Sequence, residues 1–346
     1  MKSLFSCILF LFPFLSIAQK PVIPKLEILT SGTKTSLRGL SVVNDEVVWV
    51  SGSNGTIGKS SNGGKDWKWM KVKGFEKSEF RDIEAFDAST AIIMNSSDKD
   101  PAYILRTADG GETWKVVYEN KTKGMFLDAM EFWNEHAGIV IGDPVNGKFF
   151  VVRTFDNGRT WQDVPEQYRP VADSGEACFA ASGTNVRALA NDEAIFISGG
   201  LRSSVFIQDE KFTLPIIQGK ETTGANSIAV WNRYHKKGAD RFVVVGGDFN
   251  QPESDSLNCF YSLDRGKTWK ASKTPPNGYR SCVEYLDKRI LVTCGLNGVD
   301  YTIDNAINWK PISKEGFHVC RIAKIGRTVY LAGGNGKVAK LVYPSR

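Results

Sequence analysis

The sequence predicts an all-β protein, a seven-bladed β-propeller of four-stranded blades. Three observations predict this fold: a turn motif that recurs along the chain, a constant spacing between its copies, and seven copies of an apolar strand that in most cases ends in glycine. Repetition at about 40–50 residues is typical of propellers, in which each repeat is one blade. The 346 residues are therefore expected to form one ring rather than two unrelated domains.

The turn motif reads Ser/Thr-x-Asp/Asn-x-Gly-x-Thr/Asp-Trp and is known as the Asp box. Clear copies lie at residues 60–67, 107–114, 154–161 and 262–269, and a decayed copy lies at 302–309. The residues that define the five copies are Asn62 and Trp67, Asp109 and Trp114, Asp156 and Trp161, Asp264 and Trp269, and Asp304 and Trp309. The Asp or Asn side chain is expected to accept turn N–H groups, the glycine to take a positive φ, and the tryptophan to anchor the hairpin. The acidic residues of the motif are therefore predicted to be structural.

The spacing of the motif sets the number of blades. Trp67 and Trp114 are 47 residues apart, and so are Trp114 and Trp161, which matches one four-stranded blade. Trp161 and Trp269 are 108 residues apart, so a blade without the motif is expected between them. The strand that precedes the turn recurs seven times, at residues 47–52, 91–94, 139–142, 194–200, 243–247, 290–295 and 329–334.

The last repeat ends too early to supply its own outer strand. The chain stops soon after the strand at residues 338–342, whereas Lys25 to Leu29 forms an apolar segment ahead of the first blade. Pairing this segment with the final blade closes the ring and removes two unpaired sheet edges. The N-terminal segment is therefore predicted to be the outer strand of the last blade.

Residues 1–18 have the pattern of a signal peptide: a lysine, an apolar run from Leu4 to Leu15, and small residues before Gln19. Residues 19–346 are then expected to be a single propeller domain, exported to the periplasm or the extracellular space. No later apolar run is long enough to predict a membrane span.

The net charge of +6 comes from 44 basic and 38 acidic residues, too small an imbalance to indicate nucleic-acid binding. A monomer is expected.

The cysteines and histidines do not indicate a metal or redox centre. Five cysteines remain after the predicted signal peptide, no CxxC occurs, and the chain has three histidines. We expect buried thiols and no metal. Cys282 and Cys294 are placed to face each other across a hairpin, so a disulfide between them is the alternative to two free thiols. Because no dinucleotide fingerprint precedes a helix, no cofactor is predicted.

Segments at residues 37–40, 49–52 and 62–64 together resemble the photosystem II stability and assembly factor family of seven-bladed propellers, over nearly all of the predicted mature chain. The Asp boxes are shared with bacterial sialidases and other bacterial neuraminidase repeat proteins. Residues 175–184 are similar to exported bacterial relatives that carry oxidoreductase or glycosyl hydrolase labels. The resemblance implies a scaffold that grips a partner protein or peptide.

The predicted binding site lies at one mouth of the central channel, on the face opposite the Asp boxes. Inner strands begin on that face, and the loops that follow each second strand reach it. Aligning the strand starts brings together eight polar residues: Arg38, Arg81, Arg280, His318, Asp82, Asp128, Glu176 and Asn226. The clustered arginines predict recognition of a carboxylate-bearing peptide, protein or glycan, unless Asp82, Asp128 and Glu176 already neutralise them.

A sialidase-like or other glycoside hydrolase is the alternative function. Asp82, Asp128 and Glu176 are the candidate catalytic carboxylates, and Tyr279 is the candidate nucleophile. The Phe-Arg-Ile-Pro signature of sialidases is absent, however, and their catalytic propeller has six blades. The leading expectation is therefore a non-enzymatic binding or assembly scaffold.

Overall fold

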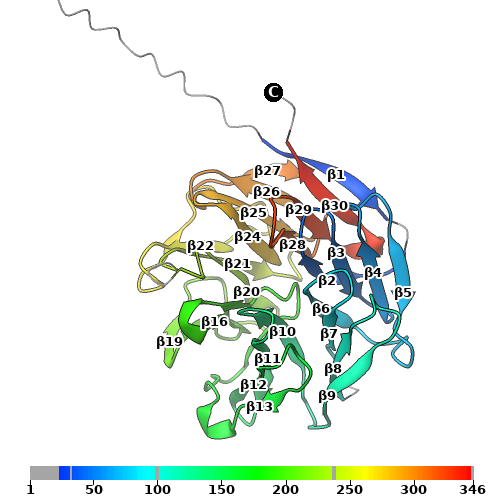
Figure 1. Ribbon diagram of the computed structural model, residues 1–346. Coiled ribbons are helices and arrows are strands. Elements are labelled where there is room, and N and C mark those ends of the chain that lie inside the picture. The colour runs from blue at the N-terminus through cyan, green and yellow to red at the C-terminus, as the bar shows by residue number, and fades with distance from the viewer. Residues whose placement is uncertain (1–22, 32, 98–100, 236–238, 344–346) are drawn as a thin grey trace, which may run out of the picture.

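The computed structural model describes residues 23–31, 33–97, 101–235 and 239–343, so the predicted signal peptide lies outside the described residues. Seven four-stranded antiparallel blades surround a central channel (Figure 1). The rest of the regular structure is a two-residue ladder and three single-turn 3₁₀ helices. The predicted fold is confirmed. None of the described helices is long and apolar enough to cross a membrane.

Each blade runs outward from the channel in strand order. Blade 1 consists of β2 (Leu37–Val42), β3 (Val48–Gly52), β4 (Thr56–Ser60) and β5 (Lys68–Lys71). Blade 2 consists of β6 (Phe80–Ala85), β7 (Ala91–Asn95), β8 (Ala102–Thr107) and β9 (Lys115–Asn120). Blade 3 consists of β10 (Leu127–Phe132), β11 (Gly138–Val145), β12 (Lys148–Thr154) and β13 (Gln162–Asp163). Blades 4 and 5 hold β15 (Val186–Ala188), β16 (Ala194–Ile197), β18 (Ser204–Ile207) and β19 (Glu210–Thr213); and β20 (Thr223–Val230), β21 (Phe242–Asp248), β22 (Cys259–Ser262) and β23 (Lys270–Ala271). Blades 6 and 7 hold β24 (Cys282–Asp287), β25 (Ile290–Gly295), β26 (Gly298–Thr302) and β27 (Lys310–Ser313); and β28 (Val319–Ile322), β29 (Val329–Ala332), β30 (Val338–Val342) and β1 (Lys25–Thr30). The remaining elements are η1 (Glu166–Tyr168), β14 (Glu176–Ala177), η2 (Ala190–Asp192), β17 (Gly199–Gly200) and η3 (Gly334–Gly336).

Strand β1 closes the ring, as the sequence predicts. It pairs antiparallel with β30, from Lys25 opposite Val342 to Thr30 opposite Val338. Leu26 and Leu29 pack against the apolar cluster between blades 6, 7 and 1. The N-terminal strand and the C-terminal strands thus share one sheet, as Figure 1 shows for the blue and red strands.

The Asp boxes connect the third and fourth strands of their blades. In the second box, Asp109 Oδ1 accepts the N–H of Thr113 at 3.0 Å, and Gly111 takes a φ of +90°. The neighbouring Gly110 N–H donates to Ser89 O at 2.8 Å, in the loop between the first and second strands. The boxes therefore lie on the face that carries these loops, called here the Asp-box face. The opposite face, where inner strands begin, is called the loop face.

Blade 4 lacks the motif for a simple reason. Strands β18 and β19 are joined by a two-residue turn at residues 208 and 209, in which Gln208 has a φ of +54°. A two-residue hairpin turn matches the strand twist without the longer Asp-box loop. The 108-residue interval in the sequence thus spans two blades, and the first of them, blade 4, has a shorter third hairpin connection.

The five described cysteines are buried free thiols. Cys282 lies directly opposite Cys294 on the neighbouring strand β25, in the place that the sequence predicts. The Cys320 thiol of the next blade lies 3.6 Å from that of Cys282, so these cysteines fill the core between blades 6 and 7.

Candidate functional site

The inner strands share one irregularity at the loop face. In four blades the pairing of the first and second strands slips by one residue at the same place, which leaves an extra residue in the inner strand. A bulge of this kind re-aims the side chain that it carries. The bulge residues are Arg38, Arg81, Asp128 and Asn226. Four of the eight predicted residues therefore occupy equivalent positions at the starts of their inner strands.

Arg280 is out of this alignment by one residue. Its backbone N–H donates to Gly246 O of the preceding blade at 2.9 Å, as Leu37 N–H does to Gly333 O and Phe317 N–H does to Gly295 O. Arg280 therefore matches Leu37, and Ser281 matches Arg38. The Arg280 guanidinium is 1 % exposed and is paired with Asp300, so it is not presented at the mouth beside Arg38 and Arg81.

Arg38 and Arg81 come together at the loop-face mouth. Burial lowers the pKa of Arg38 and the positive charge of Arg81 lowers it further, whereas Tyr279 and Glu79 raise it. Arg38 Nη1 donates to Ala181 O at 3.4 Å, whereas Arg81 lies over the Phe126 ring and its Nε has no hydrogen-bond partner. Within the described ranges, neither arginine forms an ion pair.

His318 lies beside these arginines. Its Nε2 is 3.1 Å from Ser36 Oγ, and its Nδ1 has no hydrogen-bond partner. Burial, with Arg38 and Arg81, lowers the pKa of His318 to about 3. The imidazole is therefore neutral at pH 7 and adds no positive charge to the mouth.

The predicted acidic residues do not neutralise the arginines. Asp82 accepts the backbone N–H groups of Ile83 and Met130, each at 2.8 Å, and burial raises its pKa to about 8. Burial also raises the pKa of the fully buried Asp128 well above its ordinary value, and the nearby Asp143 raises it further. Glu176 is paired instead with Lys211 at 2.8 Å. Among the described residues, neither Asp82 nor Asp128 forms an ion pair with Arg38 or Arg81, and the carboxylate that raises the pKa of Arg38 is Glu79.

Asn226 forms hydrogen bonds within the wall of the mouth. Its Oδ1 accepts the Tyr279 hydroxyl at 2.8 Å, and its Nδ2 donates to Gly224 O at 3.2 Å. Tyr279 is itself buried, and burial raises its pKa. The proposed nucleophile of a sialidase-like reaction is thus a buried hydrogen-bond donor to an amide.

A segment between blades 3 and 4 blocks the channel, which the sequence analysis did not predict. This segment, residues 178–184, is called here the channel plug. Arg38 donates a hydrogen bond to Ala181 O at 3.4 Å, and Arg321 donates one to Gly183 O at 3.1 Å. Ser182 Oγ donates to Ser281 O at 2.7 Å. Because its partners come from blades 1, 6 and 7, the plug spans the channel and separates its two mouths.

The other mouth, on the Asp-box face, opens into a pocket of about 530 Å³. Six residues at one level of the inner strands line its floor, and Ala229 is their equivalent in blade 5. Each is paired with the equivalent position of its second strand, and in the four bulged strands it lies three residues after the bulge. These seven residues, called here the channel ring, are Ser41, Glu84, Glu131, Arg187, Ala229, Glu284 and Arg321. Five of the seven positions are charged.

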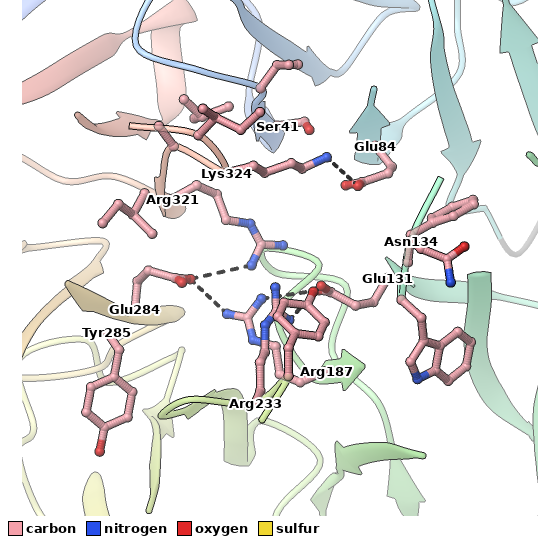
Figure 2. Close-up of a pocket in the computed structure, with 18 of the residues that line it drawn as sticks. Ser41, Glu84, Glu131, Asn134, Arg187, Arg233, Glu284, Tyr285, Arg321 and Lys324 are labelled. Carbon is pink, nitrogen blue, oxygen red and sulfur yellow. Dashed lines mark hydrogen bonds and ion pairs between the residues drawn. The ribbon is translucent and has the colours of Figure 1, made fainter. Parts of the chain in front are cut away.

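Ion pairs connect the charges of the ring across the channel (Figure 2). Arg187 contacts Glu131 at 3.4 Å and Glu284 at 3.0 Å, so that one guanidinium joins blades 3, 4 and 6. Arg321 reaches Glu284 at 3.7 Å. Two cations from loops complete the network: Arg233 pairs with Glu131 at 2.6 Å, and Lys324 pairs with Glu84. Burial raises the pKa of Glu131, but the surrounding arginines outweigh burial and lower this pKa to about 2.

The sequence contains a signal for this ring that was missed. Glu84 and Glu131 follow Arg81 and Asp128 at the same distance, as Ser41 follows Arg38. Extending the alignment of the strand starts by three residues therefore finds the ring in these blades. In blade 6 the one-residue error at Arg280 hides it.

Three comparisons place the chain among known proteins. A family model described as BNR/Asp-box repeat matches residues 260–271, which contain the fourth box. No curated protein matches in sequence. The structure titled "YCF48 bound to D1 peptide" is similar with a TM-score of 0.64 and 14 % identity, over 95 % of this chain and 100 % of that chain. YCF48 from Cyanidioschyzon merolae gives 0.61 and 15 %, over 91 % and 98 %, and the WD40 β-propeller domain of Doa1 gives 0.62 and 12 %, over 94 % and 98 %. At these identities the likeness shows a shared fold.

Proposed function

We propose that this protein is an exported, non-enzymatic scaffold that binds a carboxylate-bearing segment of a partner protein at the loop-face mouth of its propeller. The observation that carries the proposal is the pair of arginines, Arg38 and Arg81, which interact with each other while no carboxylate among the described residues pairs with them. Two neighbouring guanidinium groups that form no ion pair repel each other, and a bound carboxylate relieves that repulsion.

The geometry of the mouth supports a shallow binding site. The channel plug lies directly behind Arg38, so a ligand enters only as far as Ala181. A chain terminus or an acidic side chain presented by a partner fits such a site. YCF48, whose structure is similar, has been solved with a bound D1 peptide, which supports a peptide as the class of ligand.

No observation favours a hydrolase. Asp82 and Asp128 are at most 1 % exposed, and Asp82 is occupied with backbone N–H groups. A glycosidase requires two carboxyl groups that contact the scissile bond. Glu176 is buried and paired with Lys211, so it is not available as a replacement.

Capture of a partner by the immobilised protein tests the proposal. The variant Arg38→Ala with Arg81→Ala is expected to lose capture of envelope proteins and of acidic synthetic peptides, with its melting temperature nearly unchanged. The matched control is Arg159→Ala with Lys267→Ala, which removes the same charge from exposed positions of the Asp boxes and is expected to retain capture. Wild-type affinity in the Arg38/Arg81 variant would contradict the proposed site.

A further inference from the structure

We propose a second binding site, for a neutral saccharide, in the pocket of the Asp-box face. It lies at the other end of the channel from Arg38 and Arg81, and the channel plug separates the two mouths. The proposal therefore stands independently of peptide binding at the loop face. The pocket has a volume of about 530 Å³, which is in the range of pockets that hold small ligands.

The balance of charge in the pocket favours an uncharged ligand. Four acids line it, Glu84, Glu131, Glu135 and Glu284, and four cations line it, Arg187, Arg233, Arg321 and Lys324. All four cations are already in ion pairs with these acids. An anion entering the pocket would have to displace a carboxylate from its arginine and would meet the remaining acids. By contrast, the loop-face mouth favours an anion, because Arg38 and Arg81 form no ion pair there among the described residues.

The paired charges still offer hydrogen bonds to a neutral ligand. Figure 2 shows the Arg321 guanidinium near the middle of the pocket, where its Nη1 lies 3.7 Å from Glu284 and has no hydrogen-bond partner within the protein. The exposed amides of Asn134 and Asn232 lie at the rim; Asn134 Oδ1 accepts the N–H groups of His136 and Ala137, so Asn134 offers its Nδ2 as a donor. A sugar hydroxyl both donates and accepts, so it matches a surface on which guanidinium and carboxylate groups alternate.

Aromatic side chains supply the apolar part of the site. Trp133, Trp231 and Tyr234 line the pocket, and Tyr234 is 54 % exposed. Arg153 lies over the Trp133 ring at 4.8 Å, and Trp231 packs on Tyr285 at 5.6 Å, so both indoles are held in fixed orientations. Rigid, partly exposed rings beside hydrogen-bonding groups suit the C–H faces and hydroxyls of a sugar ring.

Titration of the whole protein with oligosaccharides tests this site. The probes are an array of neutral hexose, pentose and N-acetylhexosamine oligosaccharides, followed by calorimetry with the trisaccharide retained best. We expect one saccharide per chain, a change in tryptophan fluorescence, and an affinity that varies less than about twofold between low and high salt, because no ion pair forms on binding. Tyr234→Ala and Asn134→Ala are each expected to weaken binding at least tenfold.

Two controls separate this site from the rest of the surface. Tyr168→Ala removes an exposed tyrosine outside the pocket and is expected to leave binding unchanged, as is the Arg38/Arg81 double variant. The proposal is overturned if no saccharide of the array binds, or if binding survives Tyr234→Ala and Asn134→Ala. Preference for sialylated glycans, or displacement of the sugar by peptides that occupy the pocket more tightly, would also overturn it.

Discussion

At the residue scale, two buried aspartates have opposite roles. Asp300 is 1 % exposed and carries the ion pair with Arg280, whereas Asp128 is fully buried and no ion pair among the described residues includes it. Burial raises the pKa of Asp128, so its contribution to stability is complete at acidic pH and is lost as the pH rises toward that raised pKa.

The variant Asp128→Asn, which mimics the protonated acid, is therefore expected to be as stable as the wild type at pH 3, below the ordinary pKa of 3.8, and more stable at pH 9. Asp300→Asn leaves Arg280 buried without its counter-ion and is expected to lose about 3–5 kcal/mol. Urea unfolding at the two pH values measures both. Greater loss in Asp128→Asn than in Asp300→Asn at pH 9 would contradict the assignment.

The Asp-box tryptophans differ in burial, which gives a second prediction at this scale. Trp309 is 2 % exposed and belongs to the core between blades 5 and 6, whereas Trp67 is half-buried and stacks on Trp69. Trp309→Ala is expected to cost about 3–5 kcal/mol of unfolding free energy, because it leaves a large cavity. Trp67→Ala is expected to cost clearly less. Equal losses in chemical denaturation would show that burial does not set the contribution of the motif.

At the scale of the element, β1 completes a blade that the C-terminal strands leave unfinished. Deleting residues 25–30 removes the partner of β30 and uncovers the cluster that Leu26 and Leu29 cover. We expect a large fall in melting temperature and association of the open rings through the freed edge. Ile28→Lys, at a position 48 % exposed, is the control and is expected to change little. An unaltered melting temperature and a monodisperse deletion variant would rule out this role.

The elements also show what a sequence predicts well. The blades were predictable because most of them use the same local chemistry, a strand ended by glycine and, in five blades, a turn closed by an Asp box. The inner-strand positions of Arg38 and Arg81 followed from the same repetition. Arg280 did not, because blade 6 lacks the bulge and one residue of register separates a mouth residue from a buried one. The channel plug has no repeat to reveal it, and its contacts join distant segments of the chain.

At the scale of the whole molecule, the channel ring ties blades that are not neighbours. Glu131 receives Arg187 and Arg233, and these arginines hold its pKa at about 2. Because this pKa lies below the ordinary value of 4.5, the stabilisation is present above about pH 4.5 and is lost as the pH falls toward 2.

Glu131→Gln is therefore expected to lose about 3–5 kcal/mol at pH 7, since it leaves buried arginines uncompensated. Its stability should change less than that of the wild type between pH 6 and pH 3. Glu112→Gln breaks an exposed pair with Lys68 and is expected to cost less than about 1 kcal/mol. Parallel pH profiles of the wild type and Glu131→Gln would contradict the assignment.

The pairing of β1 with β30 also decides when the molecule can finish folding. Six blades are each made from one stretch of chain, so their hairpins form from neighbouring segments, whereas Lys25 and Val342 must find each other across nearly the whole described chain. Closing a loop of that length costs chain entropy before any contact repays it. We therefore expect closure of the seventh blade to be the slow step of folding. An open ring that has not yet closed would expose the edge of β30, and it is in that interval that we expect aggregation.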